Sequence, residues 1–185
     1  TKVGSDTNNV KALITDSTGD NFYAATATNV AKLTYNGSTW SQVSTGSPDG
    51  ALSLAIDGAG YLYAVTSTGV ITNCNLSNPF GWLPLVTVAP ATILTYDAFK
   101  GLLYAGSASS VLVSNGGGDG FTALLDSPTG VNALIADPVN GDLYAGNSTD
   151  IQKYDETIWT NITSANSPTN VNTLAIGQVL NIQAP

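Results

Sequence analysis

The chain has 185 residues, of which 43% are hydrophobic and only 10% are charged, and this length is enough for one domain with a continuous core. Thirteen acidic residues stand against five lysines, the net charge is -8, and there is no arginine or histidine. This excess of negative charge excludes binding to nucleic-acid phosphates or to anionic lipid. No apolar run approaches the ~20 residues of a membrane span, so we expect no membrane insertion.

The first complete unit covers residues 10–50, and residues 1–9 read as the tail of a preceding unit. Asp16 followed by Gly19 favours a type I turn, and Asn36-Gly37 is a strong hairpin signal. Between these turns the apolar runs predict four short strands, at 10–15, around Tyr23, at 30–35 and at 40–44.

The second strand of this unit recurs, with its tyrosine at Tyr23, Tyr63, Tyr104 and Tyr144. The spacing of 40 or 41 residues divides the chain into further units at 51–90, 91–130 and 131–170. A fixed period of this size is typical of repeat architectures, in which each unit buries its apolar face against its neighbours.

Two segments depart from the pattern. Residues 73–84 of the second unit contain Cys74 and two prolines, so we expect a longer loop there. A fifth unit opens at residues 171–185 with a predicted first strand at 171–176 and the start of a second at 179–183.

Four short antiparallel strands in ~40 residues describe one blade of a β-propeller. The sequence therefore predicts a single all-β domain, a β-propeller of four-stranded antiparallel blades with four complete repeats and partial terminal repeats.

The third unit carries the strand-turn-strand segment 111–121, in which Ser114, Asn115 and a glycine run lead to Phe121. This segment resembles the Asp-box hairpin of sialidase-like and sortilin-like propellers, with Asn115 in the usual Asp place and Phe121 in place of Trp. The repeated strand with its closing aromatic is similar to the short blades of bacterial sensor and repeat propellers. The resemblance implies a propeller architecture and no particular activity.

One aspartate follows the first strand of each unit, at Asp16, Asp57, Asp97 and Asp137. In a ring these carboxylates would lie at one level, as a cation site needs, but each also precedes a glycine as a turn-capping residue does. We interpret them as turn caps. Asp119 near Asp126 supplies too few carboxylates for a calcium loop, so we expect no metal.

Catalysis is poorly supported by this composition. Without histidine there is no Ser-His or Cys-His pair, without arginine no clamp for a substrate carboxylate, and the single glutamate is Glu156. The sequence predicts a protein that is not an enzyme and has no cofactor.

The aromatic residues that close the units offer a second kind of site. If exposed, Trp40, Trp82 and Trp159 would be sugar-stacking platforms, as in a lectin-like propeller; if buried, they close each blade against the next, which we favour.

Three functional hypotheses follow. The first is a secreted or cell-surface scaffold that pairs its incomplete ends with another copy of itself or with another protein; a periplasmic location is also compatible. Its self-association edges are predicted at Val3, Val171, Thr173, Leu174, Val179 and Leu180. The second is a glycan-binding propeller, and the third is part of a larger sensor propeller.

Overall fold

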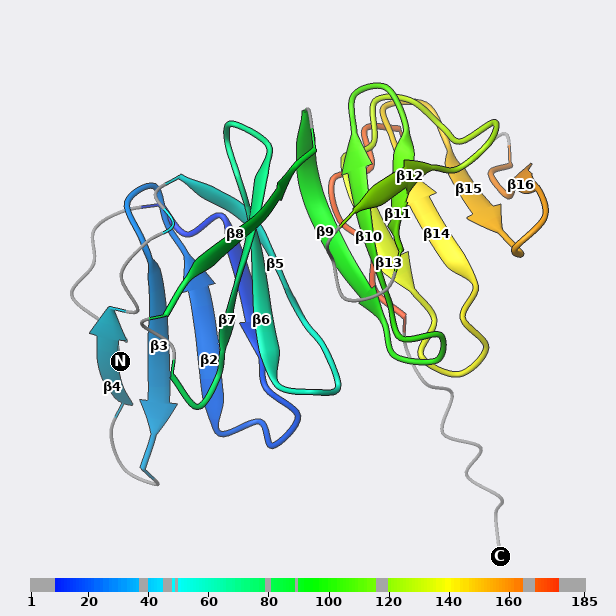
Figure 1. Ribbon diagram of the computed structural model, residues 1–185. Helices are drawn as coiled ribbons and strands as arrows, with labels where there is room; N and C mark the ends of the chain where they lie inside the picture. Colours follow the sequence, from blue (N-terminus) through cyan, green and yellow to red (C-terminus); the bar gives the residue numbers. More distant parts are fainter. Residues whose placement is uncertain are drawn as a thin grey trace, which may run out of the picture.

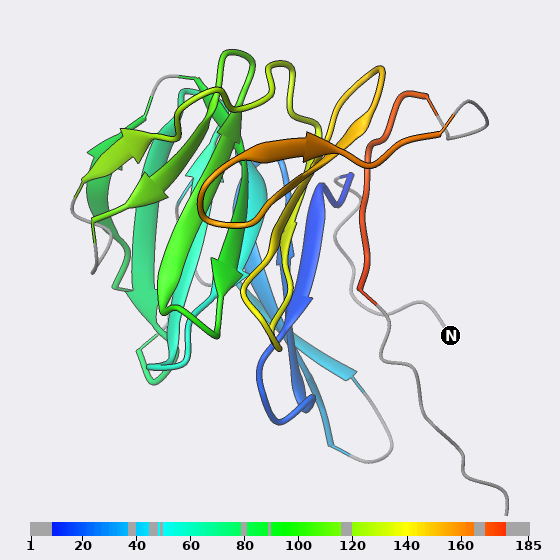
Figure 2. The same ribbon diagram turned by 90° about the vertical axis from the view of Figure 1, so that its right-hand side faces the viewer.

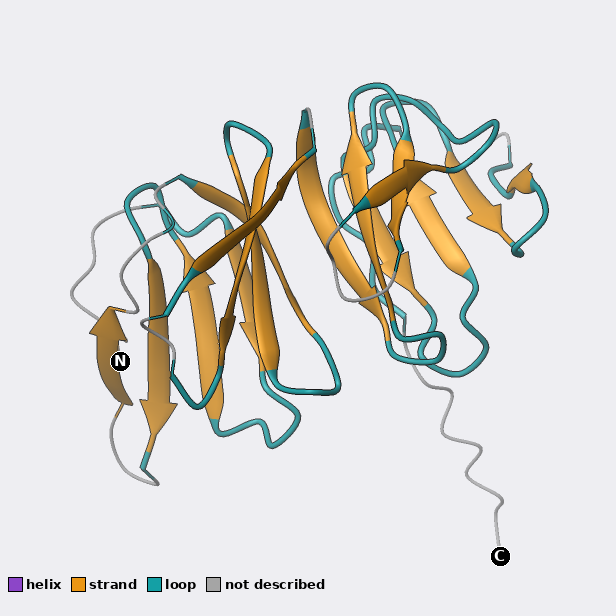
Figure 3. Cartoon of the chain, in the orientation of Figure 1, coloured by secondary structure: helices purple, strands orange, loops and turns teal. Residues whose placement is uncertain are grey.

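The computed structural model describes residues 9–36, 40–44, 48, 50–78, 81–88, 90–115, 120–164 and 169–176, and for residues 40 and 42–44 the backbone only. All regular elements in these ranges are β-strands (Figure 3). No helix in the described ranges is long and apolar enough to cross a membrane.

The described residues contain sixteen strands, which form four separate antiparallel sheets, each a meander in chain order. Blade 1 contains β1 (Ala12–Thr15), β2 (Asn21–Ala25), β3 (Val30–Tyr35) and β4 (Trp40–Ser44). Blade 2 contains β5 (Ala51–Ile56), β6 (Tyr61–Thr66), β7 (Val70–Asn75) and β8 (Leu83–Thr87). Blade 3 contains β9 (Ala91–Asp97), β10 (Leu102–Ser107), β11 (Val111–Ser114) and β12 (Phe121–Ala123). Blade 4 contains β13 (Ala133–Ala136), β14 (Leu143–Gly146), β15 (Ile151–Tyr154) and β16 (Trp159–Asn161).

The four blades stand side by side in chain order, from blade 1 at the left of Figure 1 to blade 4 at the right. The first strands of successive blades contact each other, β1 with β5, β5 with β9, and β9 with β13. In the turned view of Figure 2, the blue strands of blade 1 and the red segment 169–176 lie on the same side of blades 2 and 3. The blades therefore form a curved arc with their first strands on the inner side, and the predicted all-β propeller architecture is confirmed.

Within the described part of the chain, the buried hydrophobic residues form three clusters, one between each pair of neighbouring blades. The repeated tyrosine packs toward the following blade: Tyr23, Tyr63 and Tyr104 belong to the first, second and third cluster along the chain. A leucine in the first strand packs toward the preceding blade, as Leu54 and Leu94 do. Each blade thus contributes different residues to its two faces, which is why the first strands are apolar on both sides.

Residues 171–176 differ from the prediction, because they form no strand. Val171 nevertheless occupies the position that Val131 has just before β13: its amide donates to the carbonyl of Asn147 at 2.9 Å, as the Val131 amide donates to the carbonyl of Ser107 at 3.1 Å. No second strand pairs with this segment among the described residues, and a strand ladder requires such a partner.

The longer loop predicted in the second unit is confirmed, because the β7–β8 connection has more residues than the β3–β4, β11–β12 and β15–β16 connections. Strand β7 continues to Asn75, and the connection to β8 runs from residue 76 to residue 82. A register shift between Ile71 and Thr72 accommodates Pro84, which pairs with Thr72 on the outer strand of the sheet.

Candidate functional site

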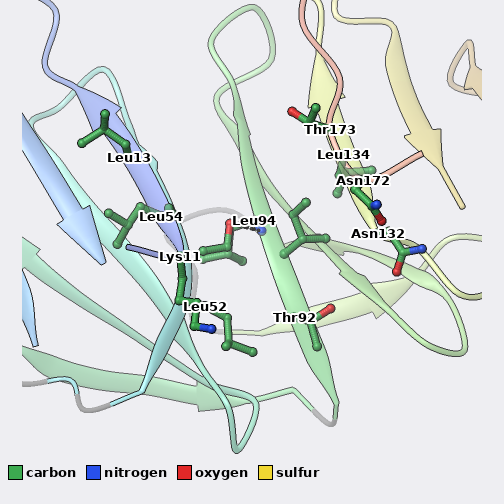
Figure 4. Close-up of a pocket in the computed structure, with 13 residues that line it drawn as sticks. Lys11, Leu13, Leu52, Leu54, Thr92, Leu94, Asn132, Leu134, Asn172 and Thr173 are labelled. Atoms are coloured by element: carbon green, nitrogen blue, oxygen red, sulfur yellow. Dashed lines mark hydrogen bonds between the residues drawn. The ribbon is translucent and has the colours of Figure 1, made fainter. Parts of the chain in front are cut away.

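The inner side of the arc encloses an open groove of about 670 Å³ (Figure 4). Its lining comes from the start of β1, β5, β9 and β13 and from residues 172–173. Leucines form its apolar part and hydroxyl and amide side chains its polar part, as Leu94, Thr92 and Asn132 illustrate. Lys11 is the one charged residue among the described residues that line the groove, so the lining holds no pair of groups for acid–base chemistry.

The face of blade 1 that points away from blade 2 exposes two apolar residues. Val10 is 58% exposed and Leu13 is 60% exposed. The repeat places each of them at a position that is buried in the other blades. Their equivalents are 0–7% exposed: Ala51, Ala91 and Val131 for Val10, and Leu54, Leu94 and Leu134 for Leu13. We call Val10 and Leu13 the blade 1 face.

The other end of the arc is partly covered. Val171 is 7% exposed and packs on Gly146, and Leu174 is half-buried. Thr173 is exposed and lines the groove. Tyr144 is half-buried, whereas the three other tyrosines of this set are almost completely buried. Among the described residues, this end therefore presents segment 169–176 against blade 4.

Of the predicted self-association edges, Val171, Thr173 and Leu174 lie together at this end, and Val3, Val179 and Leu180 lie outside the described residues. The prediction missed Val10 and Leu13. The sequence contained a signal for them, because Leu13 shares its repeat position with Leu54 but belongs to the first complete unit.

The turn aspartates make the hydrogen bonds of turn caps, as predicted. Asp16 Oδ1 accepts from the Thr18 hydroxyl at 2.7 Å and from the Gly19 amide at 3.0 Å. Asp57 Oδ1 accepts from the amides of Ala59 and Tyr61. Burial opposes ionisation of Asp16, but hydrogen bonds from Asn21, Thr18 and the backbone outweigh it and hold its pKa below the usual value.

The caps of blades 3 and 4 use the same chemistry. Asp97 Oδ1 accepts from the amides of Phe99 and Lys100, and Asp137 Oδ1 accepts from the amide of Val139. Asp119, the candidate calcium ligand of the third unit, lies outside the described residues.

Cys74 is 1% exposed inside the cluster between blades 1 and 2. Burial raises the pKa of its thiol to about 12, so the thiolate required for nucleophilic or redox chemistry is not formed at neutral pH. Cys74 is a core residue.

The tryptophans of the sugar-stacking hypothesis are half-buried where their side chains are described. Trp82 packs against the cluster between blades 1 and 2, and Trp159 against the cluster between blades 3 and 4. The Trp159 ring also stacks on Tyr154 with centroids 5.0 Å apart. Only the backbone of Trp40 is described. Sugar stacking stays a prediction, and these contacts give the rings a packing role.

No family model matches the sequence, and no curated protein matches it. Solved structures do share its fold. The chain is similar to the structure of U3-55K, with 14% identity and a TM-score of 0.73 over 86% of this chain and 53% of that chain.

Two further structures give the same result. The WD40 β-propeller domain of Doa1 has 13% identity and a TM-score of 0.71, over 94% of this chain and 60% of that chain. A chain in the nidogen/laminin complex has 15% identity and a TM-score of 0.69, over 83% of this chain and 64% of that chain. This chain thus spans about half to two thirds of the length of the propeller structures that it matches.

Proposed function

We propose that this chain is a non-enzymatic interaction scaffold and that the blade 1 face is its protein-binding surface. The observation that carries the proposal is the exposure of Leu13, at 60%, at a repeat position where Leu54 is 6% exposed. Fully burying a leucine side chain contributes about 1.5–3 kcal/mol, so covering this face would yield a substantial part of a binding free energy.

The cover that fits this face is another β-sheet. The face of blade 2 that corresponds to it is already covered by blade 1, with Tyr23 buried against Leu54 and Leu62 in one cluster. A tyrosine-bearing strand of the same kind therefore suits the blade 1 face in shape and polarity.

A second copy of the chain supplies such a strand. Its blade 4 carries Tyr144, the half-buried member of the repeated tyrosines, and Leu174 of segment 169–176 is also half-buried. Head-to-tail docking would bury the blade 1 face of one copy against the blade 4 end of the next copy. Repetition of this contact forms a closed ring or a filament, depending on the rotation between copies.

A second candidate is that blade 1 is covered by further blades of a larger propeller, such as a sensor propeller. This candidate is favoured by the structural matches, because the match covers only 53% of the U3-55K chain and 60% of the Doa1 chain.

Sedimentation of the 185-residue chain over a range of concentrations tests the proposal. Self-assembly predicts discrete oligomers, and Leu13→Asp should weaken their association because it places a charge in the contact. The matched variant Leu125→Asp should have no effect on association, because Leu125 is 84% exposed on a connecting segment. A monomer at every concentration would contradict self-assembly; the second candidate then predicts that Leu13→Asp improves solubility without any change in size.

The secreted or cell-surface setting is part of this proposal and is supported by the low content of charged residues. Labelling of intact cells with an antibody to the chain tests it, and labelling only after permeabilisation would contradict it.

A further inference from the structure

A second exposed apolar cluster lies where the first strands of blades 3 and 4 end, whereas the groove is lined by the starts of these strands. Phe99 lies in the β9–β10 turn, Val139 in the β13–β14 turn and Ile158 in the β15–β16 connection. They are 60%, 67% and 61% exposed. We call these three residues the turn patch.

Lys100 connects the three segments of the turn patch. Its Nζ lies 3.1 Å from Glu156 in the β15–β16 connection, and it donates a hydrogen bond to the carbonyl of Gly141 in the β13–β14 turn. Its side chain is 13% exposed although its neighbour Phe99 is exposed. Lys100 therefore joins the three segments that carry the patch residues, which belong to blades 3 and 4.

The Phe99 side chain of the patch lies close to the β13–β14 turn. A Cβ atom on Gly141 would lie 3.0 Å from Phe99 Cδ1 and 2.7 Å from Lys100 Cε, so the glycine lets this turn approach both residues. Exposed apolar side chains on such a fixed base are typical of binding hot spots, because little side-chain freedom is lost on binding.

The β15–β16 connection is also fixed, at the cost of backbone strain. Glu156 has a φ of 81°, which is unfavourable for a residue with a side chain. The Tyr154 hydroxyl donates to the Glu156 carbonyl at 2.9 Å, and the Ile158 amide donates to Asp155 Oδ1 at 3.1 Å. Strain of this kind is found where the position of a side chain matters for function.

The charge around the turn patch is negative. Both nearby lysines are already paired, Lys100 with Glu156 and Lys153 with Asp142 at 2.7 Å. The surrounding carboxylates outnumber them: Asp137, Asp142, Asp155 and Glu156. A partner of complementary charge carries basic side chains.

We propose that the turn patch binds a protein segment in which an aliphatic or aromatic side chain is flanked by lysine or arginine. The apolar side chain covers Phe99 and Ile158, and the basic side chains face Asp155 and Asp137. This surface is separate from the blade 1 face and does not depend on it.

The test is fluorescence anisotropy of a labelled Lys-Leu-Lys-Phe-Lys peptide with the full chain. We expect that Phe99→Ser and Ile158→Ser each weaken binding by about tenfold or more, the size of a hot-spot loss. Leu125→Ser should leave binding unchanged, because Leu125 is 84% exposed outside the patch. A peptide with serine in place of leucine and phenylalanine should bind at least about tenfold more weakly, since it lacks the apolar anchors.

Equal binding by Phe99→Ser and Leu125→Ser would overturn the proposal, because attraction between a basic peptide and an acidic protein would then explain all of the affinity. Leu13→Asp provides a check of independence and should leave peptide binding unchanged. Sizing of the same variants excludes a second copy as the occupant; loss of self-association in Phe99→Ser would also overturn the proposal.

Discussion

Gly106 of β10 lies against Val131 so closely that a Cβ atom on Gly106 would be 2.8 Å from Val131 Cγ1. The same atom would be 2.5 Å from Cγ2 of Ile93, its cross-strand partner. In blade 2 the volumes are exchanged: Val65 takes the place of Gly106, Ser53 that of Ile93, and Ala91 that of Val131. The contacts between blades therefore combine a larger side chain at one position with smaller side chains at the positions that face it.

Gly106→Ala should destabilise the protein by about 1–3 kcal/mol, because the added methyl group overpacks a core contact. Gly58→Ala is the matched control, since no atom lies within 4 Å of its Cβ position and it should change stability by less than about 0.5 kcal/mol. Chemical denaturation of both variants measures the difference. Equal stabilities of Gly106→Ala and Gly58→Ala would show that the contact between blades 3 and 4 accepts an added methyl group, contrary to the packing described here.

This compensation between neighbouring positions can be tested directly by introducing the three blade 2 residues at the equivalent positions of blades 3 and 4. The triple variant Gly106→Val, Ile93→Ser and Val131→Ala should be more stable than Gly106→Val alone, because the two smaller partners make room for the new side chain. A triple variant that is less stable than the single variant would mean that the three positions are not coupled in this way.

Gly141→Val tests a different property of glycine. Gly141 has a φ of 71° and its Cβ position lies 2.7 Å from Lys100 Cε, whereas Gly19 has a φ of 76° with nothing within 4 Å. Gly19→Val should cost about 1 kcal/mol from backbone strain alone, and Gly141→Val should cost more. Thermal melting of both variants measures this, and a smaller loss for Gly141→Val would contradict the described packing.

Much of this architecture could be predicted because the repeat fixes where each strand begins. The predicted strands at 30–35 and 40–44 agree with β3 and β4, and the turn caps such as Asp57 were recognised from the aspartate and the glycine that follows it. These features depend on local sequence, which is visible without a structure.

The candidate surfaces were predicted less well, because they depend on which residues a neighbouring segment covers in space. Leu13 and Leu54 are identical in type and in repeat position, so sequence alone could not show that only one is exposed. Phe99 and Val139 lie within turns, where an apolar residue is unusual, and this is a signal of exposed apolar side chains in the sequence itself. The expected strand at 171–176 failed because strand formation depends on a partner elsewhere in space.

Asp155 makes stability depend on pH in the acidic range. The Thr157 hydroxyl donates to Asp155 Oδ1 at 2.6 Å, and with the amides of Ile158 and Thr157 it lowers the pKa of Asp155 to about 2. A folded-state pKa below the unfolded value of about 3.9 stabilises the fold above pH 3.9, and this contribution is lost as pH falls through 2. The melting temperature should therefore decrease between about pH 4 and pH 2.

Thr157→Val isolates the contribution of the Thr157 hydroxyl, because it removes this donor to Asp155 and keeps the backbone amides. An NMR titration of the Asp155 carboxyl should show a higher pKa in the variant than in the unmodified chain. An unchanged pKa would mean that the amides alone determine the shift.

Calcium should leave the melting temperature unchanged. The carboxylates of Asp16 and Asp57 already accept hydrogen bonds on both oxygens, including one from the Tyr63 hydroxyl to Asp57 at 2.9 Å. Addition of calcium and then of a chelator, followed by differential scanning fluorimetry, tests this. A rise of several degrees with millimolar calcium would indicate binding to the folded state and make the aspartates ligands.

The last prediction compares two leucines that share one repeat position. Leu54 is 6% exposed between blades 1 and 2, so Leu54→Ala should cost about 2–5 kcal/mol of folding stability, as core truncations do. Leu13 is 60% exposed, so Leu13→Ala should cost less than about 0.5 kcal/mol in dilute solution, where its face is uncovered. If copies of the chain cover the blade 1 face, the loss for Leu13→Ala should grow as protein concentration rises, because assembly adds to the apparent stability of the unmodified chain. Denaturation at two concentrations separates these cases. A large loss for Leu13→Ala that is independent of concentration would show that blade 1 is covered within the chain itself, and the proposed binding surface would then be wrong.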